Sequence, residues 1–298
     1  MAISLKPLNE QVMVITGASS GIGLATALAA AQAGASLVLA SRSSQVLGAL
    51  AREINDAGGR AQAVVADVAN PSDVERIANA AIAQFGRIDT WVNNAGISIY
   101  GRLDEVSLVD DRRLFDVNFW GVVHGSLTAL RYLRERGGAL INVGSEVSEA
   151  VAPLQGMYSA SKHAVKGFTD ALRVEIEEVD HAPVSITLIQ PTAVDTPYPE
   201  HAKNYLTREP KLPDPQIDPE RVAEAILDAA TRPTRDKKVG LMATVNTATA
   251  KLMPGLADKL SAKKVDQQQR KEPPMRDPNG ALYRPSEDGR IRGSRAAE

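Results

Sequence analysis

The stretch VMVITGASSGIGLATALAAAQAG, residues 12–34, decides the fold of this chain. Its first residues, 12–16, form a β-branched run typical of a buried strand, and residues 22–33 carry a helical pattern. The turn between them is rich in glycine, at Gly17, Gly21 and Gly23. Glycine lets the backbone turn tightly, so that a pyrophosphate can lie against main-chain N–H groups at a helix N-terminus. Because a strand precedes the turn and a helix follows it, the stretch favours a dinucleotide-binding turn.

The rest of the chain repeats this alternation of short apolar runs and longer helical patterns. Continuous apolar runs are what a parallel sheet covered on both faces requires. The pattern therefore predicts an α/β, Rossmann-like, doubly wound fold, with helices on both faces of a seven-stranded parallel sheet. The predicted strands are 12–16, 36–41, 61–67, 88–94, 139–145, 184–190 and 237–243. The predicted helices are 22–33, 44–57, 72–85, 107–135, 157–179 and 219–231.

We expect a single catalytic domain over residues 1–263, followed by an irregular polar extension over 264–298. Residues 191–217 hold many prolines and no strong period, so they predict a long loop that can include a short helix, and loops of this length are usually functional or mobile. Residues 263–298 hold nine Lys or Arg against six Asp or Glu. Two interpretations of the extension remain open. It is a solvated tail, or it is an arm that docks on a neighbouring subunit, as the segment GALYRP (280–285) suggests.

Composition excludes several classes of function. Hydrophobic residues make up 44% of the chain and charged residues 23%, as in an ordinary soluble globular protein. The formal net charge is −2, so we expect neither nucleic acid nor an anionic membrane as a partner. The chain has no cysteine and only four scattered histidines, so we expect no disulfide and no metal site. With no apolar leader and no run of ~18 apolar residues, we expect no signal peptide, no membrane span and a cytoplasmic location.

The residues after the second predicted strand indicate which dinucleotide would bind. Sites that prefer NAD place Asp or Glu about 20 residues past the glycines, where it binds the ribose 2′-hydroxyl. This chain has Ser41, Arg42 and Ser43 there instead. A guanidinium flanked by hydroxyls suits a 2′-phosphate, so the sequence favours NADP(H) over NAD(H).

Tyr158 and Lys162 lie four residues apart in a predicted helix, so both side chains can point into one cleft. A phenol has a pKa of ~10, which is too high for efficient proton transfer at neutral pH. A nearby ammonium favours the phenolate, and an interaction of only ~1.4 kcal/mol lowers a pKa by about one. We therefore expect Lys162 to lower the pKa of Tyr158. Taken alone, a Tyr and a Lys one turn apart usually belong to an exposed helix face.

Two further polar residues strengthen the case for an active site. Ser145 ends the fifth predicted strand, and sites in doubly wound sheets lie at the carboxyl ends of strands. Its hydroxyl can donate to a carbonyl oxygen while Tyr158 delivers a proton. Asn118 lies among apolar neighbours, where a buried amide needs partners, and it could hold a water that passes protons to Lys162.

With these residues in view, the chain resembles the short-chain dehydrogenase/reductase family over about residues 10–245. The matching pieces are TGASSGIG (16–23), DV (67–68), NNAG (93–96), Asn118, Ser145 and YSASK (158–162). The resemblance implies that Tyr158 is the general acid/base, Lys162 its activator and a ribose ligand, Ser145 the substrate orienter and Asn118 the support of a relay water. It also implies Asp67 near the adenine. The expected coenzyme contacts are Gly17, Ser19, Ser20, Gly21, Ile22, Gly23, Ser41, Arg42, Ser43, Asp67, Val68, Asn94, Ala95, Gly96, Tyr158, Lys162, Pro191, Thr192, Val194 and Thr196.

Two positions depart from the family pattern. Pro191 is followed by Thr192 where the family often has glycine, although Thr196 still follows at a position that could contact the nicotinamide amide. Glu146 stands next to Ser145, where small or hydroxyl residues are common. Its carboxylate binds substrate or faces solvent, and we take solvent as the default.

The expected function is NADP(H)-dependent hydride transfer between the nicotinamide and a carbonyl or secondary alcohol. We expect the substrate pocket to be mainly apolar, with walls from 97–103, 146–157 and 192–215 and contacts from Tyr100, Val151, Pro153, Leu154, Met157 and Tyr198. Two alternatives remain: a protein that senses NADP(H) without turnover, and a dehydratase or epimerase that uses a transient hydride. The resemblance further implies a homodimer or homotetramer through helices 107–135 and 157–179.

Overall fold

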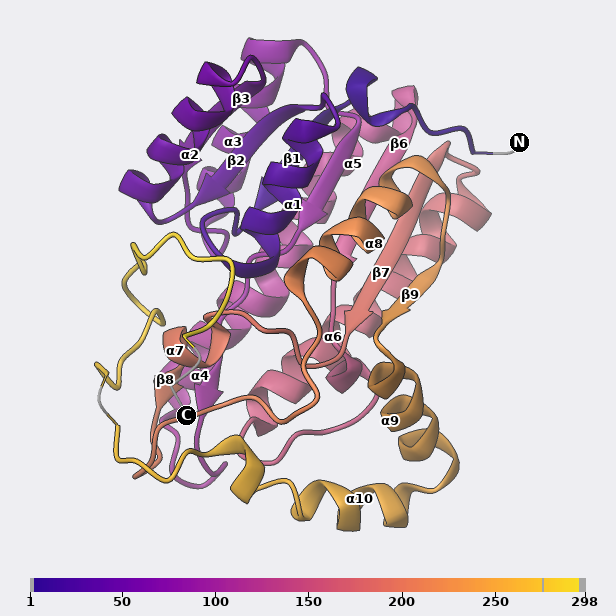
Figure 1. The fold of residues 1–298 in the computed structure, drawn as a ribbon. Coiled ribbons are helices and arrows are strands. Elements are labelled where there is room, and N and C mark those ends of the chain that lie inside the picture. The colour runs from indigo at the N-terminus through magenta and orange to yellow at the C-terminus, as the bar shows by residue number, and fades with distance from the viewer. Residues whose placement is uncertain (1–2, 275, 295–298) are drawn as a thin grey trace.

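A seven-stranded parallel sheet forms the centre of the molecule in this computed structural model, which describes residues 3–274 and 276–294 (Figure 1). The strand order is β3-β2-β1-β4-β6-β7-β9, so the chain winds outward in both directions from β1 and β4. Most of these strands are buried along their whole length, which explains their continuous apolar sequence. The strands are β1 (Val12–Thr16), β2 (Ser36–Ser41), β3 (Arg60–Val65), β4 (Thr90–Asn93), β6 (Gly138–Val143), β7 (Val184–Pro191) and β9 (Asp236–Val239).

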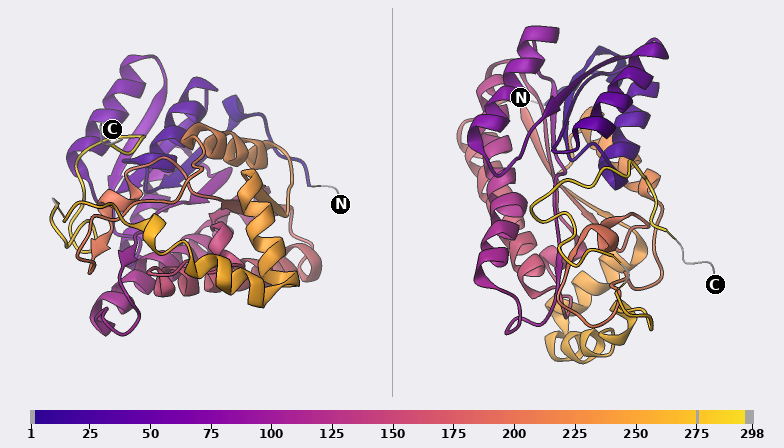
Figure 2. Two further views of the ribbon diagram at one scale, coloured as in Figure 1. Left: turned by 60° about the horizontal axis from the view of Figure 1, so that its bottom comes forward. Right: turned by 90° about the vertical axis from the view of Figure 1, so that its left-hand side faces the viewer.

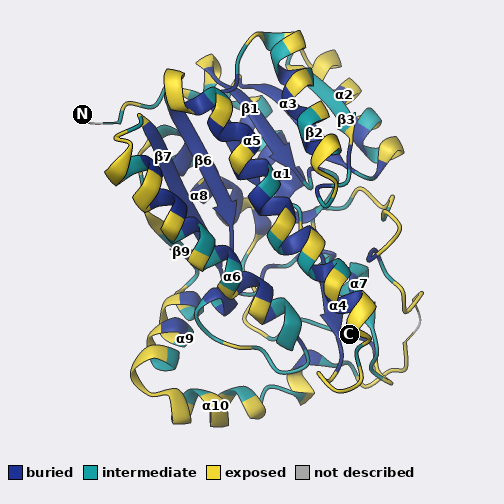
Figure 3. Cartoon of the chain, turned by 180° about the vertical axis from the view of Figure 1, so that it is seen from behind, coloured by how far each residue is buried: buried dark blue, intermediate teal, exposed yellow. Residues whose placement is uncertain are grey.

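Helices cover both faces of the sheet, which confirms the predicted doubly wound fold (Figure 2). One face packs against α1 (Gly21–Gln32), α2 (Ser44–Asp56) and α8 (Pro219–Thr231). The other face packs against α3 (Pro71–Phe85), α4 (Leu108–Phe115), α5 (Gly121–Arg136) and α6 (Gly156–Arg173). Seen from behind, these last helices expose only their outer residues, and the strands beneath them are buried (Figure 3).

Two predicted helices are interrupted. The predicted helix 107–135 is α4 followed by a π-helical turn, Asp116–Trp120, and then α5. The predicted helix 157–179 is α6 followed by a second π-helical turn, Val174–Val179. Such turns insert one residue into the helical repeat and often occur at functional sites. The apolar pattern continues through them, so the sequence period does not reveal them.

A layer beyond the carboxyl ends of the strands was missed from sequence. The predicted strand 237–243 ends at Val239, and Gly240 (φ 95°) turns the chain into α9 (Leu241–Leu252), which α10 (Pro254–Ala262) follows. The sequence of α9 holds three threonines, which are weak helix formers. The same layer holds α7 (Tyr198–His201) and a small parallel pair, β5 (Ile99–Tyr100) with β8 (Lys203–Asn204).

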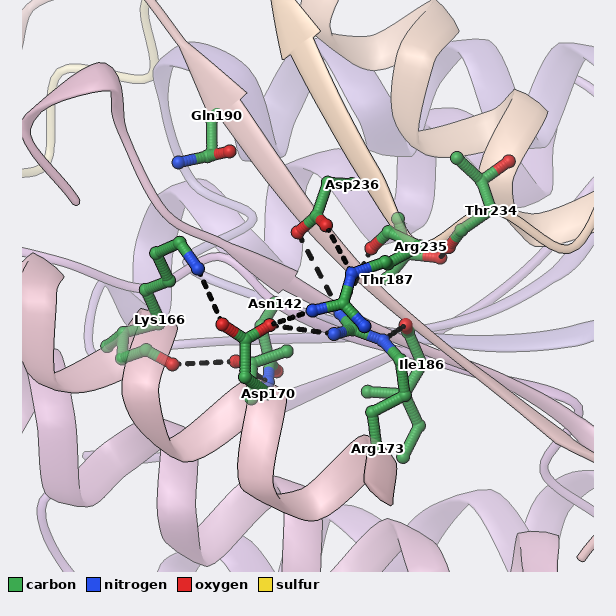
Figure 4. Close-up of polar contacts among 12 residues, drawn as sticks. Asn142, Lys166, Asp170, Arg173, Ile186, Thr187, Gln190, Thr234, Arg235 and Asp236 are labelled. Carbon is green, nitrogen blue, oxygen red and sulfur yellow. Dashed lines mark hydrogen bonds and ion pairs between the residues drawn. The ribbon is translucent and has the colours of Figure 1, made fainter. Parts of the chain in front are cut away.

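A buried arginine fixes α6 against the sheet (Figure 4). The side chain of Arg173 is 5% exposed. Its Nε donates to Ile186 O in β7 at 2.9 Å, and its Nη2 donates to Arg235 O at 3.0 Å. Its Nη1 pairs with Asp170 at 2.7 Å, and Asp170 also pairs with Lys166. These bonds set the position of the helix that carries Tyr158 and Lys162.

The C-terminal extension packs against other parts of the same chain, including Arg42 and Ser43. In Figure 1 it lies near the lower ends of β1 and β2. Leu282 is fully buried in an apolar cluster, and Ala281 is 8% exposed. A solvated tail therefore does not describe these residues. Residues 275 and 295–298 of the predicted extension lie outside the described part of the chain. Within the described part, no helix has the length and apolar character needed to cross a membrane.

Candidate active site

The glycine turn has a backbone that only glycine tolerates. Gly17 and Gly21 have φ values of 68° and 52°, in the left-handed region. A Cβ atom on Gly17 would lie 2.8 Å from Ala95 Cα, and one on Gly23 would collide with Gly17 O. Asn94 Nδ2 donates to Thr16 O at 2.9 Å and braces the turn from β4. The result is a cradle at the N-terminus of α1, the kind of site in which a dinucleotide phosphate binds.

A cavity of about 880 Å³ runs from this cradle to the predicted catalytic residues. It is lined by every predicted coenzyme residue except Gly23. Ser145, Tyr158 and Lys162 line it as well, and Asn118 lies behind its wall. The structure thus brings the two predicted halves of the site, nucleotide and catalytic, into one continuous space.

Tyr158 and Lys162 face one another on α6. Lys162 Nζ lies 5.7 Å from the centre of the Tyr158 ring and donates to Val143 O at 2.9 Å. Burial lowers the pKa of Lys162 to about 8. Burial also raises the pKa of Tyr158 to about 12, although hydrogen bonds with Tyr198 and Ser145 pull it down.

The expectation that Lys162 lowers the pKa of Tyr158 is therefore wrong for this state of the protein. Desolvation outweighs the favourable hydrogen bonds, and the carboxylate of Glu146 raises the pKa of Tyr158 further. With its pKa raised to about 12, the phenol stays protonated at neutral pH.

Asn118 is fully buried in the first π-helical turn. Its Oδ1 accepts from Ile97 N at 2.9 Å, and its Nδ2 donates to Ile97 O at 3.0 Å and to Ser161 Oγ at 3.2 Å. The amide of Asn118 therefore holds the segment after β4 against α6. It contacts the helix at Ser161, the residue before Lys162. The predicted relay water stays a prediction.

The sequence predicted Tyr198 as a pocket residue but not the contacts that it makes. Tyr198 packs edge-on against Tyr158, with ring centres 5.4 Å apart, and its hydroxyl donates to Gln155 Oε1 at 2.9 Å. Gln155 Nε2 in turn donates to Gln268 Oε1 at 2.8 Å, so a buried polar chain joins the site to the C-terminal extension. No sequence signal links Gln155 to a residue 113 positions away.

The substrate end of the cavity differs from the predicted pocket. Val151, Pro153 and Tyr198 line it as expected, but Tyr100, Leu154 and Met157 do not. Tyr100 is fully buried in the core, because β5 turns it inward. The unpredicted helices α9 and α10 supply the missing wall, through Met242, Val245, Asn246, Thr249, Ala250, Pro254, Ala257 and Leu260.

Glu146 does not face solvent. Its Oε2 accepts from Thr192 Oγ1 at 3.1 Å and from Asn246 Nδ2 at 2.9 Å, and the residue lines the cavity. The substrate end therefore carries a fixed carboxylate.

The adenosine end of the cavity holds a cluster of charges. Arg42 Nη2 donates to Ala281 O at 2.5 Å, and Arg42 Nη1 donates to Leu282 O at 3.3 Å. Asp67 pairs with Arg113 at 2.5 Å, a partner that the sequence did not suggest. Among the described residues, no group of three or more His, Cys, Asp and Glu is arranged to hold a metal ion.

This fold and site are those of a short-chain dehydrogenase. The family model described as short chain dehydrogenase matches residues 11–205, and the chain belongs to that family. The chain is 46% identical over 275 residues to the uncharacterized oxidoreductase YxnA of Bacillus subtilis, covering 91% of this chain and 77% of that protein. It is 38% identical over 188 residues to 11-beta-hydroxysteroid dehydrogenase A of Sesamum indicum, covering 62% of this chain and 53% of that protein.

Two solved structures share the fold. A short-chain dehydrogenase/reductase from Burkholderia phymatum in complex with NAD has a TM-score of 0.72 at 26% identity and covers 91% of this chain and 99% of its own. An alcohol dehydrogenase from the archaeon Thermococcus sibiricus, complexed with 5-hydroxy-NADP, has a TM-score of 0.67 at 29% identity. The match covers 77% of this chain and 94% of that chain. The protein is thus an oxidoreductase of a family that transfers hydride with NAD(P)(H).

Proposed function

We propose that this protein is an NADP(H)-dependent reductase of hydrophobic carbonyl compounds, with Tyr158 as the general acid. One observation carries the proposal. The Tyr158 phenol, with Ser145 and Lys162 beside it, opens into the same cavity as the glycine cradle. A sensor of NADP(H) would need the cradle but not a half-buried phenol and a buried lysine at the far end of the cavity.

The residues act on the substrate in distinct ways. When bound, a reduced nicotinamide supplies the hydride. Ser145 orients the substrate carbonyl through its hydroxyl, and Tyr158 donates its phenolic proton to the carbonyl oxygen. The raised pKa of Tyr158, about 12, keeps that proton in place at neutral pH, which favours reduction. Lys162 supplies positive charge beside the phenolate that the proton transfer leaves.

The preference for NADP(H) rests on the adenosine end. Ser41, Arg42 and Ser43 line the cavity there, and no carboxylate follows β2 to bind a ribose 2′-hydroxyl. The similar Thermococcus sibiricus structure is complexed with an NADP derivative, whereas the Burkholderia phymatum structure holds NAD. The local residues therefore carry this part of the proposal.

A neutral, apolar substrate suits the other end. Val147, Val151, Leu212, Met242 and Val245 line that end of the cavity. The fixed carboxylate of Glu146 repels an anionic substrate. The relative from Sesamum indicum is named for a steroid substrate, so a steroid ketone belongs among the compounds to test.

We also propose a cytoplasmic homodimer or homotetramer assembled through α5 and α6. The support is three exposed apolar side chains: Leu127 of α5 is 52% exposed, and Trp120 and Val174, in the π-helical turns next to these helices, are 49% and 52% exposed.

The test is coenzyme oxidation by the full chain with a panel of aldehydes, ketones, steroid ketones and carboxylate-bearing carbonyls, using NADPH and NADH in parallel. We expect turnover of neutral hydrophobic carbonyls and a higher kcat/KM for NADPH. Activity confined to the carboxylate-bearing compounds would refute the substrate class, and a preference for NADH would refute the coenzyme choice. A product changed without net coenzyme oxidation would indicate a dehydratase or epimerase instead.

A further inference from the structure

Backbone carbonyls of the C-terminal extension take up the donors that surround the adenosine end of the cavity. We call residues 281–290 the strap. Arg42 donates to Ala281 O and Leu282 O, and Ser43 Oγ donates to Ser286 O at 2.5 Å. At the cradle itself, Gly21 N donates to Arg290 O at 2.9 Å. The strap therefore spans the groove from the end of β2 to the start of α1.

The strap walls the cavity without filling it. Ala281, Pro285 and Ser286 line the same space of about 880 Å³ as Ser41 and Arg42 on the opposite side. A volume of this size lies within the ~300–1,000 Å³ of typical small-molecule sites. A dinucleotide in the groove would thus lie between the sheet and the strap, enclosed at its adenosine end.

The strap is anchored by residues that lie outside this cavity. Leu282 is fully buried in the apolar cluster on the α3–α5 face of the sheet. Tyr283 donates to Asp110 Oδ1 in α4 at 2.6 Å. Arg290 pairs with Glu200 in α7 at 2.6 Å, and just beyond the strap Arg292 pairs with Glu220 in α8 at 2.7 Å. Anchors on three separate helices hold a segment that has no secondary structure of its own.

The strap also holds Arg42 without neutralising it. The hydrogen-bond partners of Arg42 among the described residues are two neutral carbonyl oxygens, and the nearby carboxylate of Asp67 is paired with Arg113. Buried charges are normally paired with an opposite charge. A guanidinium has five N–H donors, so the bonds to the strap fix its plane and leave others for a phosphate.

We propose that the strap is a built-in part of the coenzyme site, which closes the adenosine end of the groove and positions Arg42 for the 2′-phosphate. Exchange of the coenzyme then requires the strap to lift. The closure follows from the dinucleotide site common to the family, and only the role of Arg42 rests on the proposed preference for NADP(H).

The test compares full-length variants by binding alone, in the absence of substrate. Leu282→Asp places a charge in the apolar cluster and detaches the strap near its first residue. Arg290→Ala combined with Arg292→Ala removes one anchor on α7 and one on α8, leaves the contact of Asp288 with His201 in place, and does not change the cavity lining. Arg284→Ala is the matched control, because this strap residue is exposed and its side chain has no hydrogen bond or ion pair with the described residues. Thermal unfolding without coenzyme checks that each variant is folded.

Dissociation rates and Kd are measured for NADPH and NADH by stopped-flow fluorescence. We expect both rates to rise about tenfold in the two detaching variants, since affinity changes of related complexes lie mostly in dissociation. The ratio of NADPH to NADH affinity should also fall, and the control should match the wild type. Unchanged rates in both folded variants, or tighter binding, would overturn the proposal. A wild type that prefers NADH would refute the coenzyme choice. The dissociation rates of NADH would still test whether the strap closes the groove.

Discussion

Tyr158 and Lys162 share one face of α6. Burial shifts the pKa of each side chain in the direction that favours its neutral form. The lysine is left with a pKa of about 8 and the phenol with one of about 12. The helix thus places the protonated phenol of Tyr158 beside Lys162, whose charge depends on pH in the ordinary assay range. The consequence is a pH profile governed by the lysine rather than by the tyrosine.

We expect kcat/KM for NADPH to fall as the pH rises through about 8, because Lys162 loses its charge there. This ratio reports groups of the free enzyme, and Tyr158 stays protonated until far higher pH. The measurement is kcat/KM for the coenzyme from pH 6 to 10, with Lys162→Arg as the variant that keeps its charge and should lack the decline. A wild-type profile that stays flat across this range would contradict the assignment.

Arg42→Ala should weaken the binding of NADPH by about 1.5–3 kcal/mol relative to that of NADH, because a hydrogen bond to a charged group usually contributes this much. Loosening of the strap in this variant affects both coenzymes alike, so the ratio of the two Kd values isolates the 2′-phosphate. Isothermal titration supplies both constants. Equal losses of affinity for the two coenzymes would show that Arg42 holds the strap and does not bind the 2′-phosphate.

The sequence predicted the residue types of the site better than their partners. Local spacing brings Tyr158 and Lys162 together, and a strand end places Ser145 beside them. The pKa of Tyr158 could not be predicted, because its burial depends on Tyr198 and on the walls of the cavity. The contacts of Arg42 with residues about 240 positions away likewise depend on the whole fold.

At the scale of elements, α6 is the critical helix, because it carries the proposed catalytic pair and is held by a buried cation. Arg173 bonds to a carbonyl of β7, to the segment before β9 and to Asp170. These contacts make the position of the active site depend on the far edge of the sheet.

Arg173→Ala should lower the free energy of unfolding by at least about 1.5–3 kcal/mol, the contribution of one hydrogen bond to a charged group, because it removes the bonds of a buried cation to Ile186 O, Arg235 O and Asp170. Arg235→Ala is the control: its side chain is 60% exposed, so its ion pairs should contribute less than about 1 kcal/mol. Urea unfolding of both variants measures the difference. A loss of similar size in the two variants would show that burial of Arg173 does not matter.

The elements themselves were largely readable from sequence, since all seven predicted strands form and pair in parallel. The π-helical turns and α9 were not. A π-helical turn leaves the apolar period almost unchanged, and α9 forms because it packs over the cavity rather than because its residues favour a helix.

At the scale of the whole molecule, the proposed oligomer would cover the exposed side chains of Trp120, Leu127 and Val174. We expect Leu127→Glu to shift the protein toward monomers, because a charge in the proposed interface would lose its hydration. Light scattering at micromolar concentration, with Leu252→Glu on the separate exposed end of α9 as the control, measures this shift. A wild type that is already monomeric would remove the proposed oligomer.

The central claim is that Tyr158 donates the proton in a coenzyme-dependent reduction. The most direct measurement is NADPH oxidation with a hydrophobic carbonyl by the wild type and by Tyr158→Phe, with the Kd for NADPH determined for both. We predict that the variant binds NADPH as the wild type does and loses about 10²–10⁴-fold in kcat. A variant that keeps its rate, or a wild type that binds NADPH and reduces nothing, would contradict the account.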